Sequence, residues 1–420
     1  MSARPEPDLG AFGYEEIEYL LEGTATSYAG HLPADFVTRL VVRRPVAAPA
    51  SGTLLVEWFN VSSGMDAAPD WTFAVDEIVR AGHAWVGVSA QYVGVEGGVG
   101  SVRVADLAAH GLRAGNPDRY AEVHHPGDAY AYDIYTQAAD AVRDLVDAAH
   151  VLAVGESQSA IMLTTYVNCV QSAARLFDGF LIHSRAAVAG PLGAAGAGVL
   201  LDEVFATEPV CFRDDLDVPV LVVQAEGDLF DRIGFLPARQ PDGPLLRLWE
   251  VAGSAHADRY VIGEFEEILG CAVPVNCGQQ WAVIRAAVRA LDVWARGGPA
   301  PPSASRLEID CDGDGLGHDF VRDRHGLVVG GVRTPVVDAP AQVVSGRPWP
   351  DSSSACRLFG STTPLVEPAF ASPSAYLVAY EAATDAAIAA GFICAEDRDA
   401  VLAEARPDLV PQTDLILGKS

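Results

Sequence analysis

The 420-residue sequence predicts an α/β protein with a mostly parallel central sheet and helices on both faces. Three observations predict this class. Short apolar runs, typical of strands buried in a parallel sheet, alternate with longer segments that carry apolar residues at helical spacing. Glycine-containing turns separate the two kinds of segment. One run ends in a serine that a helix follows directly, an arrangement that lifts a side chain above the edge of the sheet.

The composition is that of a globular protein with a sizeable core, because half of the residues are hydrophobic and 20% are charged. The formal net charge is −28, and Lys419 is the single lysine. A phosphate backbone would be repelled, so we expect no nucleic-acid partner. No apolar stretch is long enough for a membrane span, and the first residues do not resemble a signal peptide. These features favour a soluble cytoplasmic protein.

Seven cysteines are scattered along the chain without a C-x-x-C pair. This odd, dispersed set suits free thiols in a reducing compartment. Cys271 and Cys277 are close enough in sequence to bridge, and a disulfide between them is the alternative.

The first elements are expected to open the sheet. Residues 14–44 alternate in places and predict antiparallel strands. Residues 53–59 predict a buried strand, 70–81 a helix that Gly82 ends, and 84–90 the next strand.

The turn after the strand at 53–59 is polar and contains a glycine. In folds that present a nucleophile above a sheet, a loop in this position supplies the second donor of an oxyanion hole. We expect Asn60 and the Val61 amide to serve there, with a simple turn as the alternative.

Residues 91–128 form a glycine-rich, irregular segment, and long loops of this kind are usually functional or disordered. The segment contains His124 and His125, but no third metal ligand lies at a useful spacing. We therefore expect His125 in a wall or lid of a substrate pocket. Residues 129–149 then predict a long helix.

The most informative motif is Gly-Glu-Ser-Gln-Ser at residues 155–159, between the apolar run 151–154 and a helix. A serine at such a turn is strained, and the helix N-terminus adds N–H groups and a positive dipole end. The first and last positions must be small because strand and helix nearly touch there. Ser157 is thus the candidate nucleophile and the Gln158 amide a candidate oxyanion donor. The serine at the last position departs from G-x-S-x-G, and an ordinary strand-to-helix turn is the alternative.

Residues 177–182 predict a further strand, which delivers His183 and Arg185 to the carboxyl edge of the sheet. We expect Arg185 to hold a substrate carboxylate or to pair with a nearby acid, and His183 to bind substrate beside it. The alanine- and glycine-rich segment that follows leaves the sheet. Residues 186–215, like 91–128, are therefore expected to form a cap or loop insertion over the site.

Two more buried strands are predicted at 218–224 and 245–251. Glu226 and Asp228 follow the first strand, and His256 follows the second, in the permitted triad order serine, acid, histidine. Serine is a weak nucleophile at its free pKa, so an imidazole must take its proton. A buried carboxylate must then fix the tautomer and stabilise the imidazolium. We prefer Asp228 as this acid and keep Glu226 as the alternative.

The last third of the chain is predicted as an extension. After a helix at 278–296, a break rich in glycine and proline separates a core of residues 1–298 from residues 299–420, which we expect to pack on it. Residues 310–321 imitate the start of an EF-hand loop. Val321 stands where calcium needs a bidentate glutamate, so a polar hairpin turn is preferred to a calcium site. A helix is predicted at about 375–390.

These motifs resemble the α/β-hydrolase superfamily, and more closely the bacterial "alpha/beta hydrolase domain-containing" family of largely uncharacterised serine hydrolases. The stretches that carry the resemblance run through most of the chain, at residues 56–62, 125–128, 155–160, 178–185, 253–258 and 330–335. The resemblance implies an α/β-hydrolase fold and a Ser-His-acid hydrolase with Ser157 and His256 in those roles. It implies no particular substrate.

The sequence therefore predicts a serine hydrolase that cleaves a small-molecule carboxylic ester through an acyl-enzyme, without a metal or organic cofactor. An acyltransferase, a lactonase or an amidase would use the same triad. A binding protein that keeps the fold without turnover is the alternative from a different class. The acyl and alcohol parts of the substrate and the oligomeric state are left open.

Overall fold

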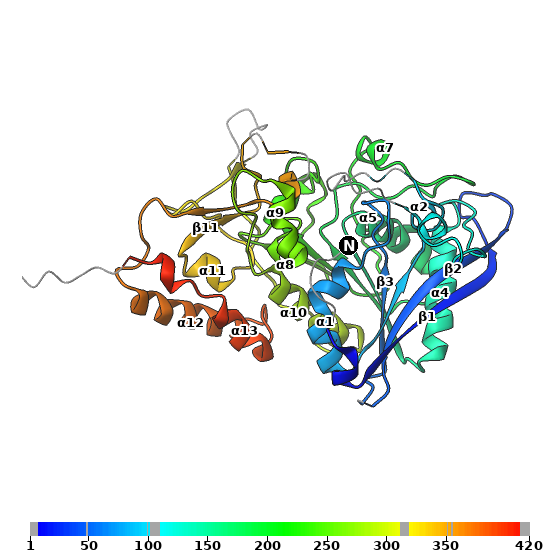
Figure 1. Cartoon of the computed structure of the whole chain (residues 1–420), viewed down its shortest axis with the longest axis horizontal. Coiled ribbons are helices and arrows are strands. Elements are labelled where there is room, and N and C mark those ends of the chain that lie inside the picture. Colours follow the sequence, from blue (N-terminus) through cyan, green and yellow to red (C-terminus); the bar gives the residue numbers. More distant parts are fainter. Residues whose placement is uncertain are drawn as a thin grey trace, which may run out of the picture.

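An eight-stranded sheet lies at the centre of the computed structural model, with strand order β1-β2-β4-β3-β5-β6-β7-β8 (Figure 1). The strands are β1 (Tyr14–Ala25), β2 (Ala34–Pro45), β3 (Thr53–Trp58), β4 (Ala84–Val88), β5 (His150–Glu156), β6 (Gly179–His183), β7 (Val220–Ala225) and β8 (Leu246–Val251). β2 is antiparallel to both neighbours, and the other pairs are parallel. The predicted mostly parallel sheet that opens with antiparallel strands is thus confirmed. The structure describes residues 7–47, 49–98, 100, 110–310, 319–350, 352–353 and 356–411.

Helices cover both faces of this sheet. The main ones are α1 (Pro69–Ala81), α4 (Ala131–Leu145), α5 (Gln158–Thr165) and α10 (Gln280–Ala295). Side chains alternate along each strand, so Val56 and Trp58 pack with α4 and α5 while Leu55 packs with α1 and α10. Because both faces are covered, both must be apolar, which explains the continuous apolar runs in the sequence.

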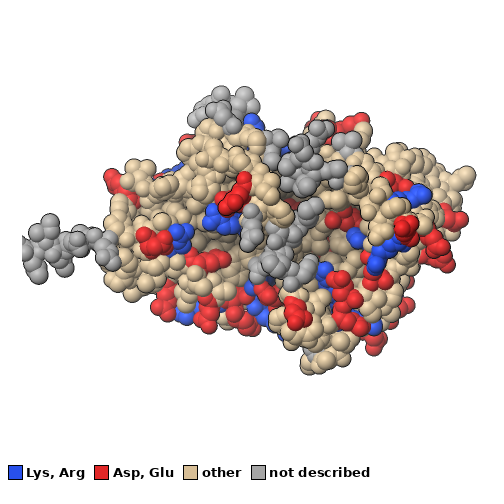
Figure 2. Space-filling model, in the orientation of Figure 1, with Lys and Arg blue, Asp and Glu red and all other residues tan. Residues whose placement is uncertain are grey.

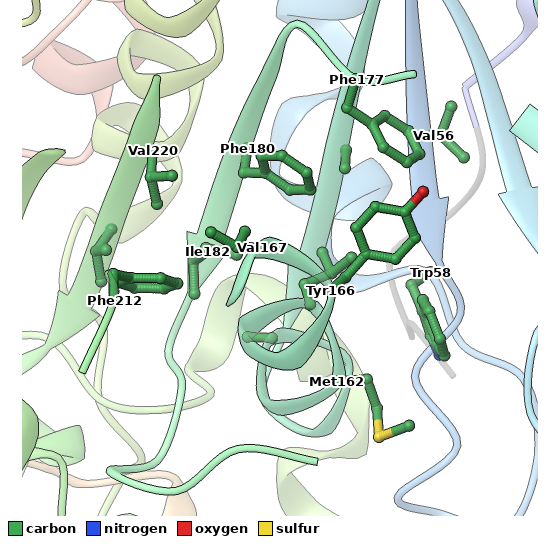
Figure 3. Packing of buried hydrophobic residues seen from close by; sticks show 14 of the residues in the cluster. Val56, Trp58, Met162, Tyr166, Val167, Phe177, Phe180, Ile182, Phe212 and Val220 are labelled. Atoms are coloured by element: carbon green, nitrogen blue, oxygen red, sulfur yellow. The ribbon is translucent and has the colours of Figure 1, made fainter. Parts of the chain in front are cut away.

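The face under α4 and α5 has an aromatic core (Figure 3). The ring centroid of Trp58, at the end of β3, lies 4.7 Å from that of Tyr135 in α4. Tyr166 belongs to a π-helical segment, η2 (Tyr166–Val170), and its ring centroid lies 5.3 Å from that of Phe177. The sequence predicted one continuous helix here and missed η2. This packing holds the carboxyl ends of β3 and β5 in place.

In their described residues, the segments predicted as insertions hold only short helices, α2 (Tyr92–Glu96), α3 (Leu112–Gly115) and α7 (Leu201–Phe205). Asp128 ties the two insertions together, because its carboxylate accepts from the backbone N–H of Tyr92 and of Val199, both at 2.7 Å. Asp128 is fully buried, and burial raises its pKa. A cap function for these segments stays a prediction.

The C-terminal part of the chain packs beyond β8, at the end of the sheet opposite to β1 (Figure 1). Its elements are β9 (Ile309–Asp310), β10 (Asp319–Phe320), α11 (Pro335–Asp338), β11 (Gln342–Ser345), β12 (Ser361–Pro364), α12 (Pro373–Ala389) and α13 (Arg398–Ala403). Tyr376 and Tyr380 of α12 lie in one buried cluster with Trp281 of α10. The extension therefore shares its hydrophobic core with the sheet domain, while the boundary at 298 stays a prediction. The middle of the predicted EF-hand-like loop, residues 311–318, lies outside the described residues.

A disulfide joins Cys271 to Cys356, 85 residues later, and Cys277 is a free thiol. The expectation of free thiols throughout is wrong for this pair, and so is the alternative of a bridge between Cys271 and Cys277. The spacing of the cysteines in the sequence did not indicate this bridge. The C-terminal extension folds back on the sheet domain, which brings Cys356 beside the segment that follows α9 (Glu266–Leu269).

Acidic side chains are spread over the face of the molecule seen in Figure 2, with basic side chains beside many of them. The chain has 56 acidic residues against 28 basic ones, so the basic side chains can neutralise only half of the carboxylates. Within the part of the chain that the structure describes, no helix has the length and apolar character of a membrane span.

Candidate active site

Ser157 occupies the sharp turn between β5 and α5. Its φ of +59° and ψ of −115° are a combination that non-glycine residues adopt only under strain. The Ser157 N–H donates to the carbonyl of His183 at 2.9 Å, which fixes the turn to β6. A Cβ on Gly155 would lie 3.0 Å from the Cβ of Ser159, so strand and helix do nearly touch here. The predicted strand, sharp turn and helix are all present.

His256 lies in the loop after β8, where the strand order brings it beside Ser157. Its Nε2 is 2.8 Å from Ser157 Oγ, and its Nδ1 is 2.6 Å from Asp228 Oδ1. With Nδ1–H donating to the carboxylate, Nε2 is left to accept the hydroxyl proton. Burial alone would lower the pKa of His256, but the charge and hydrogen bond of Asp228, together with the charge of Glu156, outweigh burial and raise it.

Asp228 ends the short 3-10 turn η3 (Glu226–Asp228) that follows β7, and its side chain is fully buried. Its Oδ2 accepts from the Ala225 N–H at 2.6 Å, which leaves Oδ1 for His256. The preferred acid therefore contacts the imidazole and is held from two sides.

Glu226, the alternative acid, is turned toward the C-terminal extension. Its Oε2 accepts from the Gly253 N–H at 2.8 Å. Its Oε1 accepts from Ser345 Oγ at 3.0 Å and from Arg322 Nη2 at 3.3 Å. Burial raises the pKa of Glu226. Glu226 thus joins the extension to the loop that carries the histidine.

The predicted oxyanion donors differ in what they contact. Gln158 is the first residue of α5, so its N–H has no partner inside the helix. The backbone N–H of Asn60 donates to the carbonyl of Ala67 at 2.9 Å. The side-chain amide of Asn60 donates to the backbone carbonyl and to Oε2 of Glu156, both at 3.0 Å. Because the donors of Asn60 are engaged in this way, the amides of Val61 and Gln158 remain the candidates.

Glu156, directly before Ser157, was not singled out in the sequence. Its Oε1 lies 3.4 Å from His256 Nε2. The side chain is buried, and burial raises its pKa to about 7. A charged residue at the end of an otherwise apolar buried strand is a signal that points to this position.

His183, predicted to bind substrate, is fully buried at the end of β6. Its Nδ1 lies 2.8 Å from Asp70 Oδ1, and its Nε2 lies 2.6 Å from Gln280 Nε2. Burial lowers the pKa of His183, but the hydrogen bond and charge of Asp70 outweigh burial and raise it. Protein groups contact both ring nitrogens, and the His183 carbonyl accepts from the Ser157 N–H, so His183 supports the turn at Ser157.

Arg185 is also fully buried. Its guanidinium donates to Thr164 Oγ1 at 3.1 Å and to the carbonyls of Ala187 and Val210, and it lies 4.9 Å from the ring centroid of Phe212. Burial lowers its pKa to about 10. Neutral oxygens and an aromatic ring therefore surround Arg185, in place of the acidic partner or the substrate-facing position that the sequence suggested.

His125, the third predicted substrate contact, is fixed inside the first insertion. Its Nε2 donates to the carbonyl of Ala90 at 2.9 Å, and its Nδ1 accepts from the Gly127 N–H at 3.2 Å. Burial lowers the pKa of His125. Among the described residues, no group of three or more His, Cys, Asp and Glu side chains is placed to hold a metal ion.

A family model described as "alpha/beta hydrolase domain" matches residues 1–403. No curated protein matches the chain. A serine hydrolase without a lid from Xanthomonas campestris is 11% identical over 67% of this chain and 97% of that chain, with a TM-score of 0.36. The esterase Est22 is 14% identical over 68% and 81%, also with a TM-score of 0.36. Est1E from Butyrivibrio proteoclasticus is 8% identical over 65% and 99%, with a TM-score of 0.33. Similarities this distant carry no information about a substrate.

Proposed function

We propose, since the chain belongs to the alpha/beta hydrolase domain family, that it hydrolyses a carboxylic ester through an acyl-enzyme. One observation supports this proposal above the others. Two hydrogen bonds, of 2.6 and 2.8 Å, link a buried carboxylate, an imidazole and a serine hydroxyl in the order Asp228, His256, Ser157. This is the arrangement that activates a serine as a nucleophile.

In the proposed reaction, Ser157 Oγ attacks the ester carbonyl while its proton moves to His256 Nε2. Asp228 stabilises the imidazolium that forms. The amides of Gln158 and Val61 donate to the negative oxygen of the tetrahedral intermediate, where the loss of one donor typically costs about 100-fold or more in rate. The imidazolium then passes its proton to the departing alcohol. Water, deprotonated by the same histidine, finally releases the acid and restores the serine.

An acyltransferase, a lactonase and an amidase would share this acyl-enzyme and differ only in the acceptor or the leaving group. A binding protein without turnover is the candidate from a different class. The strained backbone of Ser157 argues against it, because such strain costs about 1–3 kcal/mol and concentrates at active sites.

The proposal is tested by intact-mass analysis after exposure to a fluorophosphonate. We expect one adduct on the wild type, none on Ser157→Ala, and labelling at least about 1,000-fold slower on His256→Ala, because the hydroxyl then lacks its base. Ser159→Ala is the matched control, since this serine lies in the same motif and should label as the wild type does. Folded wild-type protein that gains no adduct would reject the nucleophile and favour the binding protein. A panel of esters, lactones, amides and acyl acceptors then separates the reactions that share the acyl-enzyme.

A further inference from the structure

Glu156 has no role in the reaction described above, although it lies beside the reacting atoms. Its Oε1 is 3.4 Å from His256 Nε2, the same nitrogen that lies 2.8 Å from Ser157 Oγ. The proton that leaves the serine therefore arrives on a nitrogen that also faces a carboxylate.

The position of this carboxylate is fixed by the turn after β3. The side-chain amide of Asn60 donates to Oε2 and to the backbone carbonyl of Glu156, both at 3.0 Å. Asn60 Oδ1 in turn accepts from the Ser62 N–H at 2.8 Å. With Oε2 engaged, Oε1 is the oxygen left for the imidazole.

The ionised carboxylate affects the two forms of the imidazole differently. In the neutral form, Nε2 presents a lone pair to Glu156 Oε1, which brings no attraction. In the protonated form, Nε2–H presents a positive charge to the same oxygen. An opposite charge within about 4–6 Å shifts a pKa by about 1–3 units, so ionised Glu156 favours the protonated form of His256.

We infer that Glu156 is a positioning residue that acts through His256: its carboxylate stabilises the imidazolium, strengthens the base that activates Ser157, and raises the lower pH limit of that activation. The inference rests on the proposed function and adds a fourth residue to its machinery. The test below has one readout that does not depend on reactivity.

The other charged groups around this pair come from four segments. Asp228 of η3 faces the Nδ1 side of the imidazole, and the charge of Arg232 opposes protonation of the ring. Around Glu156, the charges of His183 in β6 and Asp70 in α1 act in opposite directions. Burial raises the pKa of Glu156 to about 7, so its charge changes near neutral pH. The two groups then titrate as a coupled pair.

The test compares Glu156→Gln with wild type. Glutamine keeps an acceptor for Asn60 and removes the charge. The rate of fluorophosphonate labelling of Ser157 is measured from pH 5 to 9. We expect the midpoint of the acid limb to fall by about 1–3 pH units and the plateau rate to fall, because the imidazolium has lost one stabilising charge.

Asp258→Asn is the matched control. Asp258 is a second buried carboxyl whose pKa burial raises to about 7, and it caps the short helix α8 (Arg259–Ile262) through the N–H groups of Tyr260 and Val261. Asparagine also caps helices, so we expect the wild-type acid limb. An equal shift of the acid limb in Glu156→Gln and Asp258→Asn would mean that losing any nearby buried carboxyl shifts the acid limb. That result would overturn the inference.

NMR titration of the His256 ring is the readout that does not need a reactive serine. The pKa of His256 must be lower in Glu156→Gln than in wild type. Glu156→Asp keeps the negative charge on a shorter side chain, farther from the imidazole, and must lower the pKa of His256 by less. An unchanged pKa in both folded variants overturns the inference. Absence of labelling in the wild type with a lowered pKa in Glu156→Gln would instead reject the proposed function and leave the coupling standing.

Discussion

Glu226 and Asp228 lie two residues apart on one turn, yet their carboxylates have different partners. Asp228 contacts His256 at 2.6 Å, whereas Glu226 binds Gly253 and the extension residue Ser345. Both acids follow β7, so their positions in the sequence do not distinguish them. The direction of each side chain depends on η3 and on a segment more than 90 residues away.

These two carboxylates allow a paired substitution. We expect Asp228→Asn to slow fluorophosphonate labelling of Ser157 by up to about 10,000-fold, because an amide does not hold the imidazole in the required tautomer. Glu226→Gln should keep most of the activity and lower the free energy of unfolding by about 1–3 kcal/mol, because buried donors lose an ionised acceptor. Labelling rates and denaturant titrations measure the two effects. If Glu226→Gln lost as much activity as Asp228→Asn, Glu226 would be the acid.

At the scale of single residues, the ends of the predicted strands indicated which side chains lie near the site, but they did not indicate whether each side chain points into the site or into the core. Ser157, Asp228 and His256 follow β5, β7 and β8, and parallel order places such positions at one edge. His183 and Arg185 come from the end of β6 by the same rule, but their side chains are buried. Whether a side chain faces the site or the core depends on neighbours such as Asp70 and Thr164, which are distant in sequence.

At the scale of elements, prediction succeeded where one apolar pattern covers a whole segment. The predicted helices at 70–81 and 278–296 correspond to α1 and α10 within two residues at each end. Their apolar residues recur at helical spacing because each helix packs one face on the sheet. The π-helical segment η2 and the disulfide were missed because each depends on packing between segments that no local pattern records.

The disulfide is expected to stabilise the loop region between the histidine and α10. A bridge that closes a loop of 85 residues removes conformational entropy from the unfolded chain, which is worth up to about 4–5 kcal/mol. We expect Cys356→Ser, or reduction of the wild type, to lower the melting temperature by several degrees. Cys277→Ser removes a free thiol and serves as the control.

Thermal denaturation with and without a reductant measures this effect. The wild type should lose stability in the reductant, and Cys356→Ser should melt at one temperature in both conditions. A wild type that melts at the same temperature in both conditions would mean that the bridge does not contribute to the stability of the folded protein.

At the scale of the whole molecule, a break rich in glycine and proline predicted a boundary between a core and an extension, yet buried contacts cross this boundary. Asp397, just before α13, accepts from Arg80 of α1 at 2.7 and 2.8 Å and from Arg285 of α10 at 2.8 Å. The side chains of Arg285 and Asp397 are only 4% and 3% exposed. The cluster therefore joins the extension to both helices on one face of the sheet.

Asp397→Ala is expected to destabilise the whole chain, because Arg285 and Arg80 each lose one of two carboxylate partners and keep only Asp76 and Glu77, respectively. Hydrogen bonds to charged groups typically contribute about 1.5–3 kcal/mol. Burial opposes ionisation of Asp397, but the two arginines outweigh burial and lower its pKa. A carboxyl with a lowered folded-state pKa stabilises the protein above its unfolded pKa of about 3.9 and loses this effect as the pH falls through the folded value. The stability difference between wild type and Asp397→Ala should therefore be full at pH 7 and shrink below about pH 4. Denaturant titrations across this range measure it, with Asp408→Asn as a control, since Asp408 pairs with Arg406 at the exposed surface. A difference that stayed constant down to pH 3 would show that Asp397 stabilises the fold by packing and not by its charge.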